Sequence, residues 1–128
     1  MAKPQAGRII WTDLTVSNTD EVRDFYKAVV GWEASGVEMG VDYQDYNMLP
    51  PGGEPAAGIC HARGVNANLP PQWLIYITVT DLDESIAACT RLGGKVVVPA
   101  REIGGNRFCV IQDPAGAVAA LYQLAETE

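Results

Sequence analysis

Residues 14–21 read LTVSNTDE, and residues 77–84 read ITVTDLDE. Four of these eight pairs are identical, at an offset of 63 residues. Further pairs at the same offset are Gly31 with Gly94, Pro51 with Pro114 and Gly53 with Gly116. A duplication at fixed spacing determines the architecture of a chain before any single element does. The sequence therefore predicts two pseudo-equivalent halves, at about residues 8–61 and 72–124, around one shared cleft.

The first half is predicted to contain a strand, a helix and three more strands. Residues 8–16 are rich in β-branched side chains and predict a strand. Asn18 with Glu21 three residues later predicts a capped helix start, and Gly31 predicts its end. One apolar stripe of that helix is expected to comprise Val22, Phe25, Tyr26, Val29 and Val30. Three shorter strands are expected near residues 32–39, 42–49 and 56–62.

The second half repeats this order. A strand is expected over residues 72–80, and Asp81 with Glu84 predicts a second capped helix, which Gly93 and Gly94 end. The three following strands are expected at residues 95–101, 106–112 and 117–124. One such unit alone would leave an exposed sheet edge and an uncovered face. We therefore expect an α+β protein in which two βαβββ repeats form a cupped, partly open, eight-stranded mixed barrel with the helices outside.

Composition limits the classes of partner. The 128 residues are expected to form a single domain, residues 1–128. The net charge of −7 without a cluster of Lys and Arg disfavours nucleic acid and acidic membranes as partners. No apolar run approaches the roughly 20 residues that span a bilayer, and the N-terminus lacks a signal-peptide pattern, so a cytoplasmic protein is expected.

The three cysteines are widely separated. Cys60, Cys89 and Cys109 fit neither a disulfide framework nor a metal knuckle. We expect them to be small buried hydrophobic residues, with Cys109 as the candidate for a reactive thiol.

Four short motifs carry a resemblance to a known family. They are FYKAVVGW at residues 25–32, DPAG at 113–116, WTDL at 11–14 and GNRF at 105–108. In their order and spacing they resemble the vicinal oxygen chelate superfamily, which includes glyoxalase I, extradiol dioxygenases and bleomycin-resistance proteins. The last two motifs look closer to a glyoxalase-like subgroup.

The resemblance implies where a metal ion would bind. Metal-using members place one ligand on the first strand and one on the last strand of each half. The matching positions in this sequence are Trp11, Leu74, Ala120 and, by subtracting the offset, Ala57. None of these side chains can bind a cation, and the chain has one histidine. We therefore expect no metal and no cofactor, and metal-dependent glyoxalase or dioxygenase activity is disfavoured.

The cup that remains would suit a small apolar or aromatic molecule. The ligand-binding candidates are Trp11, Asp13, Tyr46, His61, Leu74, Tyr76, Arg107 and Ala120. Asp13 is an inward carboxylate on a central strand, and alternation from Ala57 places His61 in the cup, so both are catalytic candidates. Arg107 could bind a carboxylate or phosphate of the ligand, or be a solvated loop residue.

Three functions remain open at this point. The first is a bleomycin-resistance-like protein that binds a small organic molecule without a metal. The second is a metal-independent enzyme of isomerase or lyase type, with Asp13 or His61 as acid or base. The third is a non-catalytic dimerisation or accessory module. The resemblance also implies a homodimer.

Overall fold

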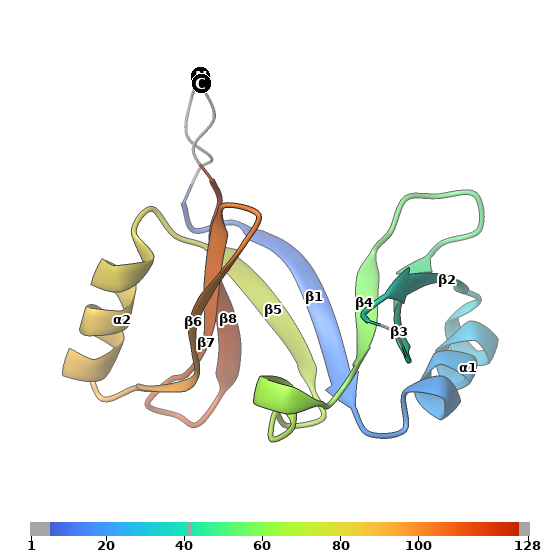
Figure 1. The fold of residues 1–128 in the computed structure, drawn as a ribbon, viewed down its shortest axis with the longest axis horizontal. Helices are drawn as coiled ribbons and strands as arrows, with labels where there is room; N and C mark the ends of the chain where they lie inside the picture. Colours follow the sequence, from blue (N-terminus) through green and yellow to red (C-terminus); the bar gives the residue numbers. More distant parts are fainter. Residues whose placement is uncertain (1–5, 41, 126–128) are drawn as a thin grey trace. The chain divides into compact units, whose positions relative to one another are not determined.

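The structure is a computed structural model and describes residues 6–40 and 42–125. It divides into two compact units, Trp11–Leu74 (the first half) and Met1–Ile10 with Ile75–Glu128 (the second half). The elements are β1 (Ile9–Val16), α1 (Thr19–Val30), β2 (Glu33–Glu38), β3 (Gln44–Leu49), β4 (Ala57–His61), β5 (Trp73–Thr78), α2 (Leu82–Arg91), β6 (Lys95–Ile103), β7 (Asn106–Gln112) and β8 (Val118–Gln123) (Figure 1). A 3-10 turn, η1 (Gly64–Asn66), precedes β5.

In the first half the strands lie in the order β2-β3-β4-β1. The pair β1–β4 is parallel, while β2–β3 and β3–β4 are antiparallel. Leu14, Val16, Met48 and Ile59 form the buried core, against which Tyr26 and other side chains pack. Leu14, Met48 and Ile59 thus point toward α1, and their neighbours along each strand point to the opposite face.

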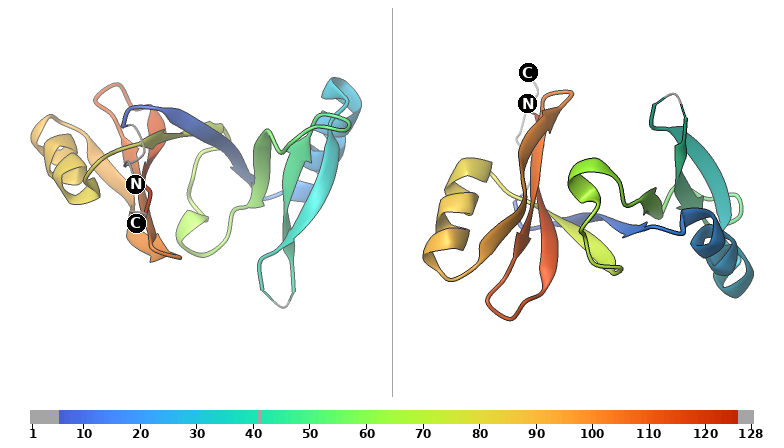
Figure 2. Two further views of the ribbon diagram at one scale, coloured as in Figure 1. Left: turned by 90° about the horizontal axis from the view of Figure 1, so that it is seen from above. Right: turned by 60° about the horizontal axis from the view of Figure 1, so that its bottom comes forward.

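In the second half the order is β5-β8-β7-β6. The pair β5–β8 is parallel, and β7 pairs antiparallel with both β8 and β6 (Figure 2). Backbone bonds from Gly7 N to Thr78 O (2.7 Å) and from Thr78 N to Arg8 O (2.8 Å) place the segment before β1 alongside β5. The buried core under α2 contains Leu82, Cys109 and Leu121.

The two helices begin by different means. In α2, Asp81 accepts a hydrogen bond from the backbone N–H of Glu84 at 3.1 Å, the predicted cap. In α1, Asn18 makes no capping bond to the backbone and instead donates its side-chain amide to Glu21 Oε1 at 3.1 Å. Thr19 donates its hydroxyl to Val16 O at 3.0 Å, which joins the helix start to the end of β1. Gly31 ends α1 in the left-handed conformation, with a φ of 86°, as predicted.

The predicted α+β class with two βαβββ repeats is confirmed by the element order. The apolar stripe of α1 was only partly correct. Val22 and Tyr26 pack on the first-half core, whereas Phe25 (56% exposed), Val29 (64%) and Val30 (52%) lie at the surface. Enclosure of a cup and the single-domain assignment stay predictions. Neither helix in the part of the chain that the structure describes has the length and apolar character of a membrane-spanning segment.

Candidate functional site

Polar side chains gather on the first-half sheet face that points away from α1. Leu14 and Ile59 point toward α1, so the residues one step along the strands, Asp13 and Cys60, point the other way. Asp13 pairs in register with Gly58, and Thr15 pairs with Cys60. This face, which we call the polar face, therefore contains the first predicted catalytic candidate.

Asp13 is held by Trp11. The indole Nε1–H of Trp11 donates to Asp13 Oδ1 at 2.6 Å, a charge-assisted hydrogen bond. Gly58 makes the space for this pair, because a Cβ at position 58 would clash with Asp13 Oδ1 and lie 3.5 Å from Trp11 Nε1. The absence of a side chain at position 58 thus allows the carboxylate to lie over β4.

His61 forms a dyad with Asp45. Asp45 Oδ1 accepts a hydrogen bond from the backbone N–H of His61 at 2.8 Å and lies 3.0 Å from His61 Nδ1. Asp45 is 9% exposed, so this carboxylate is largely removed from water. A carboxylate at Nδ1 favours the tautomer with its proton there, which leaves the lone pair on Nε2. An imidazole held in this way can accept a proton.

Alternation along β4 does not support the predicted position of His61 in the cup. A role of His61 in a ligand site stays a prediction. Ala57 and Ile59 lie on the α1 side of β4, so strict alternation from Ala57 would not bring His61 to the polar face. His61, the last residue of β4, nevertheless contacts Asp45 through both its backbone N–H and its ring. The ring of Tyr43 meets the imidazole edge-on at 5.1 Å, and the guanidinium carbon of Arg63 lies 3.9 Å from the centre of the Tyr43 ring.

Cys60 completes this cluster between the two carboxylates. Burial raises the pKa of the Cys60 thiol, and the charges of Asp13 and Asp45 and a hydrogen bond with Asp45 raise it further. Cys60 is therefore a neutral thiol at physiological pH. It can donate a weak hydrogen bond but is a poor nucleophile.

Cys109 is fully buried under α2, as predicted for a small hydrophobic residue, and this burial disfavours the alternative of a reactive thiol at this position. Burial, with a smaller contribution from Cys89, raises its pKa to about 11. A thiol of this pKa holds roughly one part in a thousand of thiolate at pH 8. The neutral form favours folding at pH values below the ordinary pKa of 9.0, and this contribution is lost as the pH rises from 9.0 toward 11.

We expect Cys60 and Cys109 to react with iodoacetamide at pH 8 much more slowly than Cys89. The reason is the raised pKa of both thiols together with the burial of Cys109. Peptide mass spectrometry of the folded protein over a time course measures the three rates. Labelling of Cys109 as rapid as that of Cys89 would contradict this result.

The second-half sheet has an aromatic face on the side away from α2. Ile77 and Leu121 point toward α2, so Tyr76, Ala120 and Tyr122 point away from it. The neighbouring β7 contributes Phe108, which pairs in register with Tyr122. The ring planes of Phe108 and Tyr122 are nearly parallel, at 16°, with centroids 6.0 Å apart, and Tyr76 lies 6.1 Å from Tyr122.

Arg101 places a positive charge beside the rings of this aromatic face. It pairs with Phe108 across β6 and β7, and its guanidinium carbon lies 4.8 Å from the centre of the Phe108 ring. Sequence reasoning singled out Arg107 instead. Arg107 lies one step along β7 and donates two hydrogen bonds to Asp83 of α2, at 2.9 and 3.2 Å. Its role as a ligand-binding residue stays a prediction that these contacts disfavour.

The other predicted ligand-binding residues are placed as follows. Tyr46 lies on the α1 side, where its hydroxyl donates to Asp20 Oδ1 at 2.8 Å and the guanidinium carbon of Arg23 is 4.7 Å from its ring centre. This hydrogen bond raises the pKa of Tyr46. Leu74 is 4% exposed and Ala120 is fully buried. Their contact with a ligand stays a prediction.

The residues at the implied metal positions do not fit a cation. The strand register corrects one of them, because Ala120 pairs with Tyr76 while Asp13, the equivalent of Tyr76, pairs with Gly58. The equivalent of Ala120 is therefore Gly58, not Ala57. The indole of Trp11 has an N–H but no lone pair to coordinate a metal, and Leu74, Gly58 and Ala120 offer no ligand atom. Among the described residues, no group of three or more His, Cys, Asp or Glu side chains could hold a metal ion.

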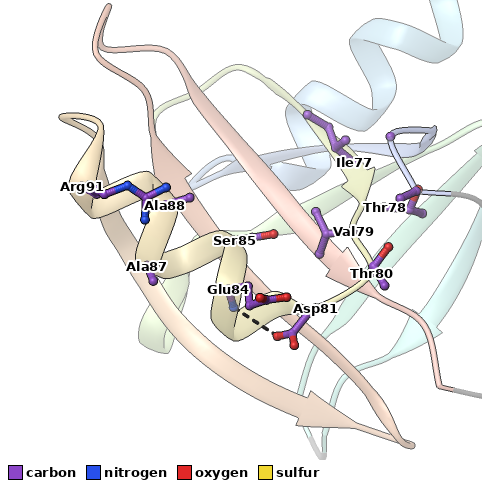
Figure 3. A pocket seen from close by; sticks show the side chains of 12 residues that line it. Ile77, Thr78, Val79, Thr80, Asp81, Glu84, Ser85, Ala87, Ala88 and Arg91 are labelled. Atoms are coloured by element: carbon purple, nitrogen blue, oxygen red, sulfur yellow. Dashed lines mark hydrogen bonds between the residues drawn. The ribbon is translucent and has the colours of Figure 1, made fainter.

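A groove beside α2 is formed by residues of the second half alone. It has a volume of about 710 Å³ and runs between the helix and residues 77–81 (Figure 3). Ser85, Glu84 and Arg91 border it from the helix side. The Asp81 carboxylate at its end caps the helix through the Glu84 N–H, so this group is already used.

Known proteins resemble this chain over nearly its whole length. The model of the "Glyoxalase/Bleomycin resistance protein/Dioxygenase superfamily" matches residues 8–121. A Mycobacterium bovis protein named "Putative glyoxylase CFP32" is 31% identical over 122 residues, which cover 94% of this chain and 46% of that protein. "Anthracycline biosynthesis protein DnrV" of Streptomyces peucetius is 27% identical over 94% of this chain and 42% of its own length. The chain thus spans less than half the length of these curated relatives.

Solved structures share the fold. The crystal structure of methylmalonyl-CoA epimerase from Mycobacterium tuberculosis matches with a TM-score of 0.57 and 20% sequence identity, over 98% of this chain and 93% of that one. At this level of identity the likeness supports the fold.

Proposed function

Because the chain belongs to the Glyoxalase/Bleomycin resistance protein/Dioxygenase superfamily, we propose that it binds a small apolar or aromatic molecule without a metal ion. The observation that carries this proposal is the position of Trp11 and its hydrogen bond to Asp13. Trp11 occupies a position where the resemblance implies a cation ligand, and its N–H is bonded to Asp13. Ligand binding then depends on aromatic surface and on a few fixed polar groups.

Three further observations support an aromatic ligand over a coenzyme A thioester. The aromatic face of the second half offers three rings, Tyr76, Phe108 and Tyr122, on adjacent strands. A coenzyme A thioester carries several phosphate groups, and the net charge of −7 opposes their approach. The name of the Streptomyces relative refers to anthracyclines, which are polycyclic aromatic compounds. A planar polycyclic ligand is the class that we favour.

The test is a thermal-unfolding screen of the protein with planar aromatic compounds, before and after treatment with EDTA. A ligand present at 100 times its Kd should stabilise the folded state by about 2.7 kcal/mol. We expect at least one compound to raise the Tm equally before and after chelation, and to be recovered unchanged. Failure of every compound in a chemically varied panel would contradict the proposal.

The Asp45–His61 dyad supports a second candidate, a metal-independent enzyme. With Nδ1 held by a buried carboxylate, Nε2 of His61 can act as a general base toward an acidic C–H or O–H group of the ligand. Asp13 is the alternative base, but its carboxylate is engaged by Trp11. This candidate makes His61 the acid–base residue and Asp45 its positioning residue.

Solvent-exchange measurements distinguish the enzyme from the binder. Once a ligand is known, the enzyme should exchange an acidic ligand proton for deuterium in D₂O. H61Q should abolish this exchange while it leaves the Kd within about threefold, and D45N should slow it and shift its pH profile. Absence of exchange in the unmodified protein would leave only the binding function.

We further propose that the protein is a cytoplasmic homodimer. The apolar side chains of Phe25 and Val29 lie one helical turn apart on α1 and are exposed, which supports burial against another surface. Light scattering of the purified protein at several concentrations should give twice the monomer mass. F25E should lower that mass, while E21Q on the same helix should not. A dimer with neither ligand binding nor exchange would favour the accessory-module alternative.

A further inference from the structure

A row of four side chains crosses the second-half sheet on the face away from α2. The pairs Arg101–Phe108, Phe108–Tyr122 and Tyr122–Thr78 are directly opposite each other on β6, β7, β8 and β5. Directly opposite side chains on adjacent strands lie within contact range. The row therefore has a cation at one end, two nearly parallel rings in the middle and a hydroxyl-bearing residue at the other end.

The residues beside this row are apolar and buried. Val98, Val110 and Ala120 form the next row on the same face, and each of them is buried, with exposed fractions of 2%, 3% and 0%. Tyr76, which pairs with Ala120, ends that row with a third ring. These buried side chains support the sheet beside the row, whereas Phe108 and Tyr122 are half-buried and Arg101 is exposed, so the row itself is the part of this face that a ligand can contact.

Arg101 has no carboxylate partner in the part of the chain that the structure describes. Arg107, one step along β7 from Phe108, is by contrast bonded twice to Asp83. Arg101 is exposed, and its guanidinium carbon lies 4.8 Å from the centre of the Phe108 ring. It can therefore donate two parallel hydrogen bonds to a carboxylate without first breaking an ion pair.

We propose that this row recognises a planar aromatic carboxylate. The ring system stacks on Phe108 and Tyr122, and its carboxylate accepts hydrogen bonds from Arg101. This inference rests on the proposed binding function and names the ligand class of its aromatic face. The complementary charge on Arg101 is what selects an acid over a neutral compound of the same shape.

The experiment compares 2-naphthoate with 2-naphthamide, which have nearly the same shape and differ in charge. Isothermal titration of the unmodified protein should give a Kd for the carboxylate at least about tenfold lower than for the amide. In R101Q the two affinities should become equal, with the amide unaffected. R91Q is the control, because it removes a positive charge from the exposed last turn of α2, and it should keep the preference.

A second variant tests the rings. F108L should weaken both compounds by a similar factor of about five to ten, because it removes stacking surface but no charge. Equal affinities in the unmodified protein, a preference that survives in R101Q, or a preference lost equally in R91Q would each overturn the inference. Binding of both compounds without selectivity would leave the proposed function standing. Binding of neither, nor of any other planar aromatic compound, would overturn both.

Discussion

Replacing Ile59 by alanine is expected to lower the free energy of unfolding by about 2–5 kcal/mol. Ile59 is fully buried, pairs with Leu14 on β1 and with Tyr46 on β3, and packs with Met48 under α1. Alanine would leave a cavity beside Leu14 and Met48. This cavity could close only if α1 moved toward the sheet. Urea denaturation of both proteins measures the difference.

The matched control is V37A, on β2 of the same sheet. Val37 is 37% exposed, so its truncation should cost less than about 1 kcal/mol. An I59A protein that loses no more stability than V37A would contradict the assignment of this core.

Replacing Gly58 by alanine is expected to displace the Asp13 carboxylate and weaken both folding and ligand binding. The added methyl group would occupy the space of Asp13 Oδ1, so the hydrogen bond from Trp11 must break. We expect a loss of about 1–3 kcal/mol in the free energy of unfolding, and a Kd for an identified ligand at least about tenfold higher. Denaturation and titration calorimetry measure the two effects.

G36A is the control for this change. A Cβ at position 36 would also meet an oxygen, but that oxygen is at the end of the long, exposed side chain of Gln44, which can move away. The G36A protein should therefore be close to the unmodified one in stability and affinity. If G58A behaves like G36A, the Trp11–Asp13 pair contributes neither to folding nor to ligand binding.

The repeat made most of the fold predictable, because strand and helix periodicity persist through both halves. The alternation of side chains along each strand does not determine how neighbouring strands are aligned with each other. One residue more or less in a loop moves the equivalent of Ala120 from Ala57 to Gly58 and so to the other face of β4. The same one-residue slip changes the face of β4 on which alternation places His61.

Arg101 shows a second limit of the sequence. Counting by twos from Val98, which pairs with Val110, would put Ala100 opposite Phe108. A bulge between Val98 and Arg101 puts Arg101 there instead, while Ala100 packs toward the α2 core. Pro99 lies within this irregular stretch, and proline inside a strand is typical of bulges and edges. That proline was the signal in the sequence that could have directed attention to Arg101.

The dyad of Asp45 and His61 was also beyond sequence reasoning. Tyr46, its neighbour on β3, was the predicted site residue, but β3 directs odd-numbered side chains away from α1. Whether the odd- or the even-numbered side chains of a strand face the core depends on the core that the strand covers. In a short strand of mixed composition, the sequence does not determine which set faces inward. Tyr46 consequently contacts Asp20 and Arg23 of α1.

Titration calorimetry with a planar aromatic ligand, on protein split into untreated and chelated portions with metal content measured in each, is the most direct test of metal-free binding. One site per chain with the same Kd in both portions, at far below one metal ion per chain, is the expected result. One nickel, iron, zinc or manganese ion per chain in the untreated portion, together with loss of binding after chelation, would contradict it.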